Sequence, residues 1–169
     1  SLNKLKLNFD GWLGMPKDAI NMDIAFNTPS TDFKSLLSLI PENYMKDFED
    51  LETTGNFNLD GRVEGSYEDG KLPAFSANLS VSDGTISYPD LPRAVTAINI
   101  KANVENPGGS GMENKVNVSS FHAEMAENPM DASLQMHTTE DDVEMKGALT
   151  GKLDFSRLSE LISLEGMEL

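Results

Sequence analysis

The chain has 169 residues and a formal net charge of −15, from 28 acidic and 13 basic residues. This length suits one domain with a real hydrophobic core. The charge argues against nucleic acid and against adhesion to an anionic lipid surface, because both partners require a cationic protein face. The chain has no cysteine, which excludes disulfides and thiolate zinc sites.

Apolar and polar residues alternate in short runs along most of the chain, which is typical of strands with one buried face. Turn-forming pairs separate these runs, among them Asp60-Gly61, Asp69-Gly70, Asp83-Gly84 and Asn128-Pro129. The spacing predicts about eight to ten antiparallel strands rather than βαβ units. The expected fold class is mainly β: a large curved antiparallel β-meander, groove- or half-barrel-like, with two short amphipathic helices.

The run KVNVSSFHAEM changes phase near its middle. Its valines occupy even positions before Ser119-Ser120, whereas Phe121, Ala123 and Met125 occupy odd positions after it. A β-bulge at the serine pair would keep all of these apolar side chains on one face.

Two segments have helical period, TDFKSLLSLI and LDFSRLSELI, and both contain D-F-x-x-L-x-x-L-I. They predict helices at 32–40 and 154–162, with Asp32 and Asp154 placed to cap the first turns. Each follows a strand-like run, so we interpret them as an internal repeat; chance recurrence of a good cap and an amphipathic face is the alternative. The apolar helix positions are Phe33, Leu36, Leu37, Ile40, Phe155, Leu158, Leu161 and Ile162.

Domain organisation follows from the same pattern. The chain starts in a strand-like run and stops after a helix-like segment, and no apolar run approaches the ~18 residues of a membrane span. We expect residues 1–169 to form a single β-rich domain that is a fragment of a longer, membrane-anchored protein.

The sequence contains no recognisable catalytic or metal-binding motif. His122 and His137 stand in no zinc-binding motif, and no nucleophile elbow or phosphate-binding loop is present. The acidic clusters at 47–52 and 140–144 lack the spacing of a calcium loop, so we interpret them as solvated turns and faces. The sequence therefore predicts no catalytic residue, no metal site and no cofactor, and a protein that is not an enzyme.

The apolar strand faces exceed what two short helices can cover. Such a sheet must close into a sandwich or barrel, or curl into a trough. A trough suits acyl chains, because each buried methylene contributes ~0.8 kcal/mol. The residues alone nevertheless favour an ordinary β-sandwich core over such a trough. A sugar-binding β-domain using Trp12 or Tyr88 is a third interpretation.

Three segments in order carry a family resemblance: TDFKSLLSLIPENY, LETTGNFNLDGRVEG and PAFSANLSVSDGTISYPDLPRAVTAINIKANVENP. They contain a D-x-x-x-L-L-x-x-x-P helix, a G-x-x-x-x-x-G-x-x-x-G strand, an Asp-Gly pair, a Y-P-x-L-P stretch and a strand with Ala97-Ile98-Asn99-Ile100. This order, over roughly residues 18–165, resembles the C-terminal region of the AsmA family of bacterial envelope proteins, in its Bacteroidetes form.

The resemblance implies a non-catalytic role in outer-membrane biogenesis, with phospholipid or another acyl-chain lipid bound or conducted along an apolar β-groove that the two helices cover. It also implies a periplasmic protein that works with other envelope proteins and is tethered to the inner membrane by parts outside this chain. The alternative is a structural or interaction β-sandwich module of the envelope without lipid binding. The expected lipid-facing residues are Phe57, Leu59, Val63, Phe75, Leu79, Val81, Ile98, Ile100, Val104, Val116 and Val118.

Overall fold

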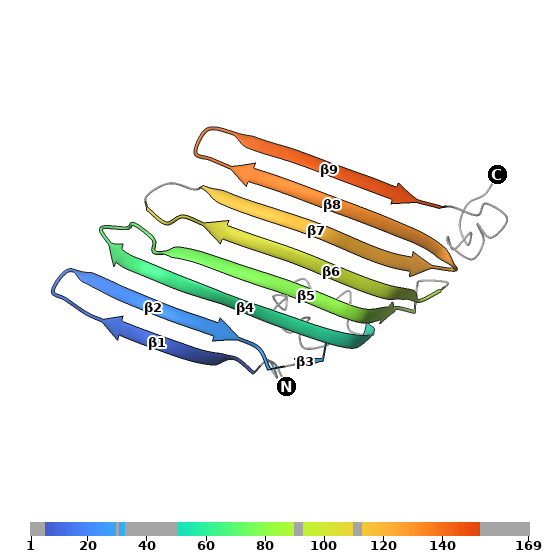
Figure 1. The fold of residues 1–169 in the computed structure, drawn as a ribbon, viewed down its shortest axis with the longest axis horizontal. Helices are drawn as coiled ribbons and strands as arrows, with labels where there is room; N and C mark the ends of the chain where they lie inside the picture. The colour runs from blue at the N-terminus through green and yellow to red at the C-terminus, as the bar shows by residue number, and fades with distance from the viewer. Residues whose placement is uncertain (1–5, 30, 33–50, 90–92, 110–112, 153–169) are drawn as a thin grey trace.

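A computed structural model of the protein describes residues 6–29, 31–32, 51–89, 93–109 and 113–152. These residues form one open antiparallel sheet of nine strands (Figure 1). The expected large antiparallel meander is confirmed. The strands are β1 (Asn8–Gly14), β2 (Ala19–Asn27), β3 (Thr31–Asp32), β4 (Glu52–Glu68), β5 (Ala74–Ser87), β6 (Val95–Asn106), β7 (Asn114–Met125), β8 (Asn128–Thr138) and β9 (Val143–Gly151).

The strand order in the sheet is β1-β2-β4-β5-β6-β7-β8-β9, and the short β3 pairs with β4 beyond the end of β2. The predicted helix 154–162 lies outside the described residues, as does the helix 32–40 apart from Asp32, which ends β3. The described part of the chain contains no helix that is long and apolar enough to cross a lipid bilayer.

Two of the expected turns are instead interior to strands. Asp60-Gly61 lies in the middle of the 17-residue β4, where Gly61 pairs with Phe26 on one side and Ala77 on the other. Asp83-Gly84 lies within β5, where the register with β6 shifts and Asp83 has a φ of 51°. At the first site glycine allows neighbouring groups to approach the backbone closely, and at the second it lies in a β-bulge. An Asp-Gly pair alone does not distinguish either role from a turn.

The other two expected turns are found, one of them displaced. Asp69-Gly70 closes the β4–β5 hairpin, with φ values of 48° and 77°. At the β7–β8 hairpin Asn128 already belongs to β8, and the turn is made by Ala126 and Glu127. Asn128 instead donates its side-chain amide to the carbonyl oxygens of Met125 and Ala126, at 3.2 and 2.8 Å.

The expected bulge in β7 is confirmed. The register against both neighbouring strands shifts at Ser119-Ser120. Val118 then pairs with Leu134 and Phe121 with Ala132, so the apolar side chains before and after the serines share one face.

The fully buried apolar side chains of the described strands gather toward the end of the sheet at which β3 pairs with β4. They are Phe57, Val81, Ile98 and Ala123, and Phe57 is 0% exposed. Partly buried residues on the same strands pack against this cluster, so the described core is tightest at that end and looser toward the β1–β2 turn.

Candidate functional site

The candidate site is one face of the sheet, which we call the apolar face. Directly paired residues of antiparallel strands point to the same side of a sheet, so the register assigns each side chain to a face. One row of paired residues crosses eight strands and contains no polar side chain. This row consists of Phe9, Phe26, Gly61, Ala77, Val104, Val116, Met136 and Met145.

The register brings all eleven of the expected lipid-facing residues to the apolar face. Phe57, Val81 and Ile98 are buried there, and the other eight are partly exposed. Whether any of them contacts lipid stays a prediction. The eight partly exposed members are Leu59, Val63, Phe75, Leu79, Ile100, Val104, Val116 and Val118.

The apolar face carries no Asp, Glu, Lys, Arg or His at any position paired in the register. Its few polar positions lie toward the strand ends. Asn106 and Asn114 pair there by a 3.0 Å hydrogen bond between their side chains, and Thr53 is buried at the other end. An uncharged surface of this extent imposes no electrostatic cost on an apolar ligand.

The apolar face is wider than the set of residues that the sequence singled out. It reaches both edge strands, where Phe9 is 66% exposed and Leu149 is 72% exposed. The same alternation of apolar and polar residues marks these outer strands, whereas the residues expected from the family resemblance all lie between positions 57 and 118. The additional residues include Phe9, Leu13, Ile20, Met22, Ile24, Phe26, Tyr67, Ile86, Val95, Phe121, Met125, Met130, Leu134, Met136, Val143, Met145 and Leu149.

The predicted helix cover cannot be placed against this face. Its residues lie outside the described part of the chain. They are Phe33, Leu36, Leu37, Ile40, Phe155, Leu158, Leu161 and Ile162.

The opposite side of the sheet, which we call the polar face, is built from amides, hydroxyls and charges. Asn103 donates to Asn78 at 3.1 Å, and Asn78 donates to Asp60 at 2.9 Å, along a row that crosses neighbouring strands. Arg62 Nε donates to Asp23 at 2.8 Å, and this contact raises the pKa of the guanidinium. These polar side chains hydrogen-bond to one another while exposed to water, so the polar face resembles an ordinary solvated surface.

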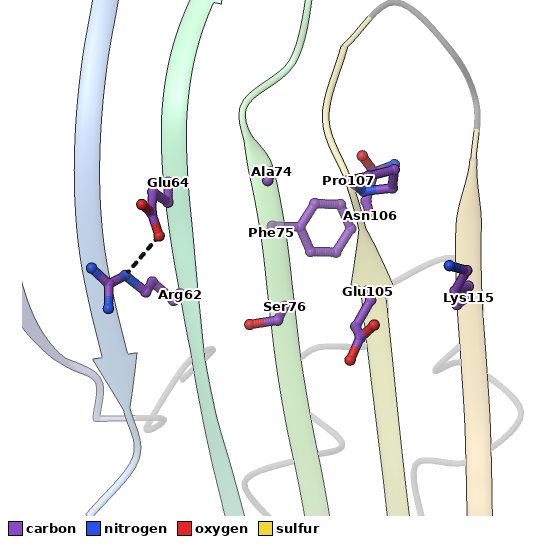
Figure 2. A pocket seen from close by; sticks show the side chains of 9 residues that line it. All are labelled: Arg62, Glu64, Ala74, Phe75, Ser76, Glu105, Asn106, Pro107 and Lys115. Atoms are coloured by element: carbon purple, nitrogen blue, oxygen red, sulfur yellow. Dashed lines mark ion pairs between the residues drawn. The ribbon is translucent and has the colours of Figure 1, made fainter.

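A shallow depression on the polar face has a volume of about 250 Å³ (Figure 2). Its polar lining mixes Arg62, Glu64, Glu105 and Lys115, and the ion pair between Arg62 and Glu64 spans 3.4 Å. Figure 2 shows these side chains spread over several strands rather than converging on one point.

The two histidines belong to the polar face. The ring of His122 lies 2.8 Å from Asp131 and 3.6 Å from Glu124, and the Asp131 hydrogen bond raises the pKa of His122. His137 lies 3.2 Å from Glu113. No group of three metal-binding side chains occurs among the residues that the structure describes.

The other sequence candidates occupy turns or separate ends of the sheet. Residues 140–142 lie in the β8–β9 turn, where the Thr139 amide donates to the Asp142 carbonyl at 2.8 Å. Trp12 lies on β1 near the β1–β2 turn, whereas Tyr88 follows the far end of β5. Trp12 and Tyr88 therefore do not come together to stack on one sugar.

The geometry points to a surface that would act through its extent rather than through a pocket. The chemistry of this face is the exclusion of water from apolar groups. Comparison with known proteins adds no identity: no family model, no curated protein and no solved structure matches this chain.

Proposed function

We propose that the chain is a non-catalytic, lipid-handling segment of an AsmA-like envelope protein, in which acyl chains lie along the apolar face. The observation that carries the proposal is the face itself, which crosses eight strands without a charged side chain. The described strands contribute no second β-layer against it, as a sandwich would. Burial of each methylene of an acyl chain there is worth ~0.8 kcal/mol.

Phospholipid is the favoured ligand class because its acyl chains suit the apolar face and its headgroup suits the surrounding water. The acyl chains would lie on uncharged side chains, several of them methionines, which adapt to irregular shapes. The headgroup would stay in water, because the chain carries a net charge of −15 and offers no cluster of cations for a phosphate on the described strands. Such contacts hold the chains while leaving the lipid free to slide.

The cellular setting is part of the same proposal and rests on the family resemblance. The segment would lie in the periplasm, tethered to the inner membrane by parts outside this chain, and would serve outer-membrane biogenesis. Other envelope proteins would deliver and accept the lipid.

Lipid extraction tests the proposal directly. Protein purified without detergent should release phospholipid to organic solvent, identified by mass spectrometry, and the stripped protein should bind a fluorescent fatty acid. Leu79→Asp places a charge on the apolar face and should abolish binding of the probe, because burial of an unpaired charge is costly. Ser80→Asp is the matched control, since Ser80 pairs with Lys101 on the polar face of the same strand.

A second pair of variants keeps the test decisive if Leu79→Asp fails to fold. Met145 is 65% exposed on the apolar side of β9, and Ala148 lies on the polar side of the same strand. Met145→Asp should weaken probe binding, whereas Ala148→Asp should not. Protein that carries no lipid and ignores the probe would overturn the proposal and favour a structural or interaction module of the envelope.

A further inference from the structure

We infer that one corner of the sheet is a membrane-docking tip, formed by two neighbouring hairpin turns. One turn joins β1 to β2 and the other joins β4 to β5. Ala19 at the start of β2 pairs with Glu68 at the end of β4, so the two turns lie side by side. Figure 1 shows both turns at the same end of the sheet. We define the docking tip by Trp12, Leu13, Met15, Tyr67 and Leu72.

Each residue of the docking tip exposes a large apolar side chain to solvent. Met15 is 73% exposed, Trp12 57%, Leu72 49%, Leu13 48% and Tyr67 44%. Isolated exposed apolar residues are ordinary, but these five lie at one corner of the sheet: Met15 and Leu72 in the two turns, Trp12 and Leu13 at the end of β1, and Tyr67 near the end of β4. Trp12 pairs with Asp23 and lies on the polar face, whereas Leu13 and Tyr67 lie on the apolar face, so the corner exposes apolar side chains on both sides. Exposed apolar groups gathered in this way mark interaction sites.

The backbone presents these side chains rather than leaving them on loose loops. Leu72 is held by two hydrogen bonds to Gly109, with its amide donating at 3.0 Å and its carbonyl accepting at 2.8 Å. The Trp12 ring extends over Gly14, where an added Cβ would lie 3.4 Å from it, so the indole leans toward the turn. The tip is therefore a preformed surface.

The chemistry of the tip matches the boundary between headgroups and acyl chains. Tryptophan and tyrosine favour this boundary because each has an apolar ring and a polar group. Lys17 and Lys71 lie in the same two turns, with aliphatic stems that can follow apolar neighbours while the amine stays in water. Tryptophan, tyrosine and methionine are also common in protein–protein interfaces, but lysine is depleted there, so the two lysines favour a lipid surface as the occupant.

Charge selects the kind of lipid surface. Lys17 and Lys71 are offset by Asp18, Glu68 and Asp69, and the whole chain carries a net charge of −15. An anionic bilayer would repel such a protein, whereas a zwitterionic bilayer would not. The expected occupant is a zwitterionic phospholipid surface.

The tip is continuous with the apolar face. Leu13 pairs with Met22, and Tyr67 pairs with Ile20, so both side chains belong to that face as well as to the tip. The apolar face is most deeply buried at the opposite end, at Phe57 and Val81. A lipid leaving a bilayer at the tip would therefore reach the face without crossing a polar barrier. Docking goes beyond the proposed function and requires only the tip.

The protein contains its own reporter, because Trp12 is the single tryptophan. Neutral phosphatidylcholine vesicles should shift its emission to shorter wavelength, and phosphatidylcholine brominated on the acyl chains should quench it. The double variant Met15→Ser/Leu72→Ser should partition into these vesicles about tenfold more weakly, because two apolar side chains are lost from the interface. Leu7→Ser is the control, since Leu7 is 37% exposed at the opposite end of β1.

Each outcome decides the inference. An emission spectrum that ignores neutral vesicles overturns it, as does an equal loss of partition in Leu7→Ser. Quenching of Trp12 in the wild-type protein by brominated lipid requires no variant, so it tests insertion of the tip even where a variant misfolds. Binding of fluorescent fatty acid is measured separately without vesicles: uptake without vesicle binding would reject the tip alone, and vesicle binding without uptake would reject the lipid-handling proposal alone.

Discussion

The ring of Phe26 on β2 occupies the space beside Gly61, its partner on β4. A Cβ built on Gly61 would overlap the Phe26 ring and the carbonyl oxygen of Ser76. The Phe26 ring thus fills the space that a side chain at position 61 would occupy. This contact joins the β1–β2 hairpin to the rest of the apolar face.

Gly61→Ala should therefore lower the free energy of unfolding by about 1–3 kcal/mol, the usual cost of an overpacked site. Chemical denaturation followed by circular dichroism measures the change. Gly147→Ala is the control, because its Cβ would approach nothing closer than the Ser133 carbonyl oxygen at 3.2 Å. Equal effects at the two glycines would contradict the role of Phe26.

The bulge in β7 leads to a second prediction. Deletion of Ser119 alone removes the extra residue and restores plain alternation, so Val118 and Phe121 stay on one face. Deletion of both Ser119 and Ser120 instead makes Val118 and Phe121 neighbours in sequence, so the side chains on one side of the deletion must turn to the opposite face. Phe121 and Ala123, which pack in or against the core, would then face water. We expect the double deletion to destroy cooperative unfolding in a urea titration, and the single deletion to preserve it. Ser119→Ala loses only a 3.3 Å hydrogen bond to the Lys101 carbonyl and should unfold like the wild-type protein.

The sequence predicted the faces of this sheet better than its turns. Alternation of apolar and polar residues depends only on strand period, and it placed all eleven candidate residues on one side correctly. Asp-Gly pairs have several physical uses, so the same signal marked a real turn at Asp69-Gly70 and a strand interior at Asp60-Gly61. The contact that requires Gly61 comes from Phe26, 35 positions earlier, and local pattern cannot reveal it.

The docking tip illustrates a second limit of sequence reasoning. Trp12 and Leu72 are 60 positions apart, and nothing in the local pattern of either segment shows that both lie at one corner of the sheet. Their proximity follows from β2 pairing directly with β4, because β3 pairs farther along the same strand. A plain meander in sequence order would have separated the two hairpins by a strand.

The β7–β8 turn supplies a third prediction. Its two central residues, Ala126 and Glu127, have φ values of 49° and 62°, a conformation that L-residues other than asparagine and aspartate adopt at a cost. Ala126→Asn should raise the free energy of unfolding by about 0.5–1 kcal/mol, because asparagine tolerates this region. Ala126→Val should have the opposite effect, since a β-branched side chain is strained there. Thermal denaturation of the two variants provides the comparison, and a stabilised valine variant would argue against this turn geometry.

The pair His122 and Asp131 predicts a dependence of stability on pH. The hydrogen bond that the His122 ring donates to Asp131 raises the pKa of His122 above its ordinary value of 6.5, against a smaller effect of burial. The groups that face the ring are Glu124 at 3.6 Å, Asn99 on β6 and Thr150, which pairs with Asp131 from β9. Because the folded protein holds the proton more tightly than the unfolded chain does, the contribution is fully present below about pH 6.5.

That contribution is lost as the pH rises through the pKa of the folded protein, so the urea midpoint should fall over this window. Asp131→Asn removes the charged acceptor and should move the pKa of His122 back toward its ordinary value, as read from the ring proton shifts in an NMR titration. His137→Gln identifies which of the two histidine signals is which. An unmoved His122 titration in Asp131→Asn would mean that the hydrogen bond does not cause the shift, and the pH dependence of stability would then have to come from other groups.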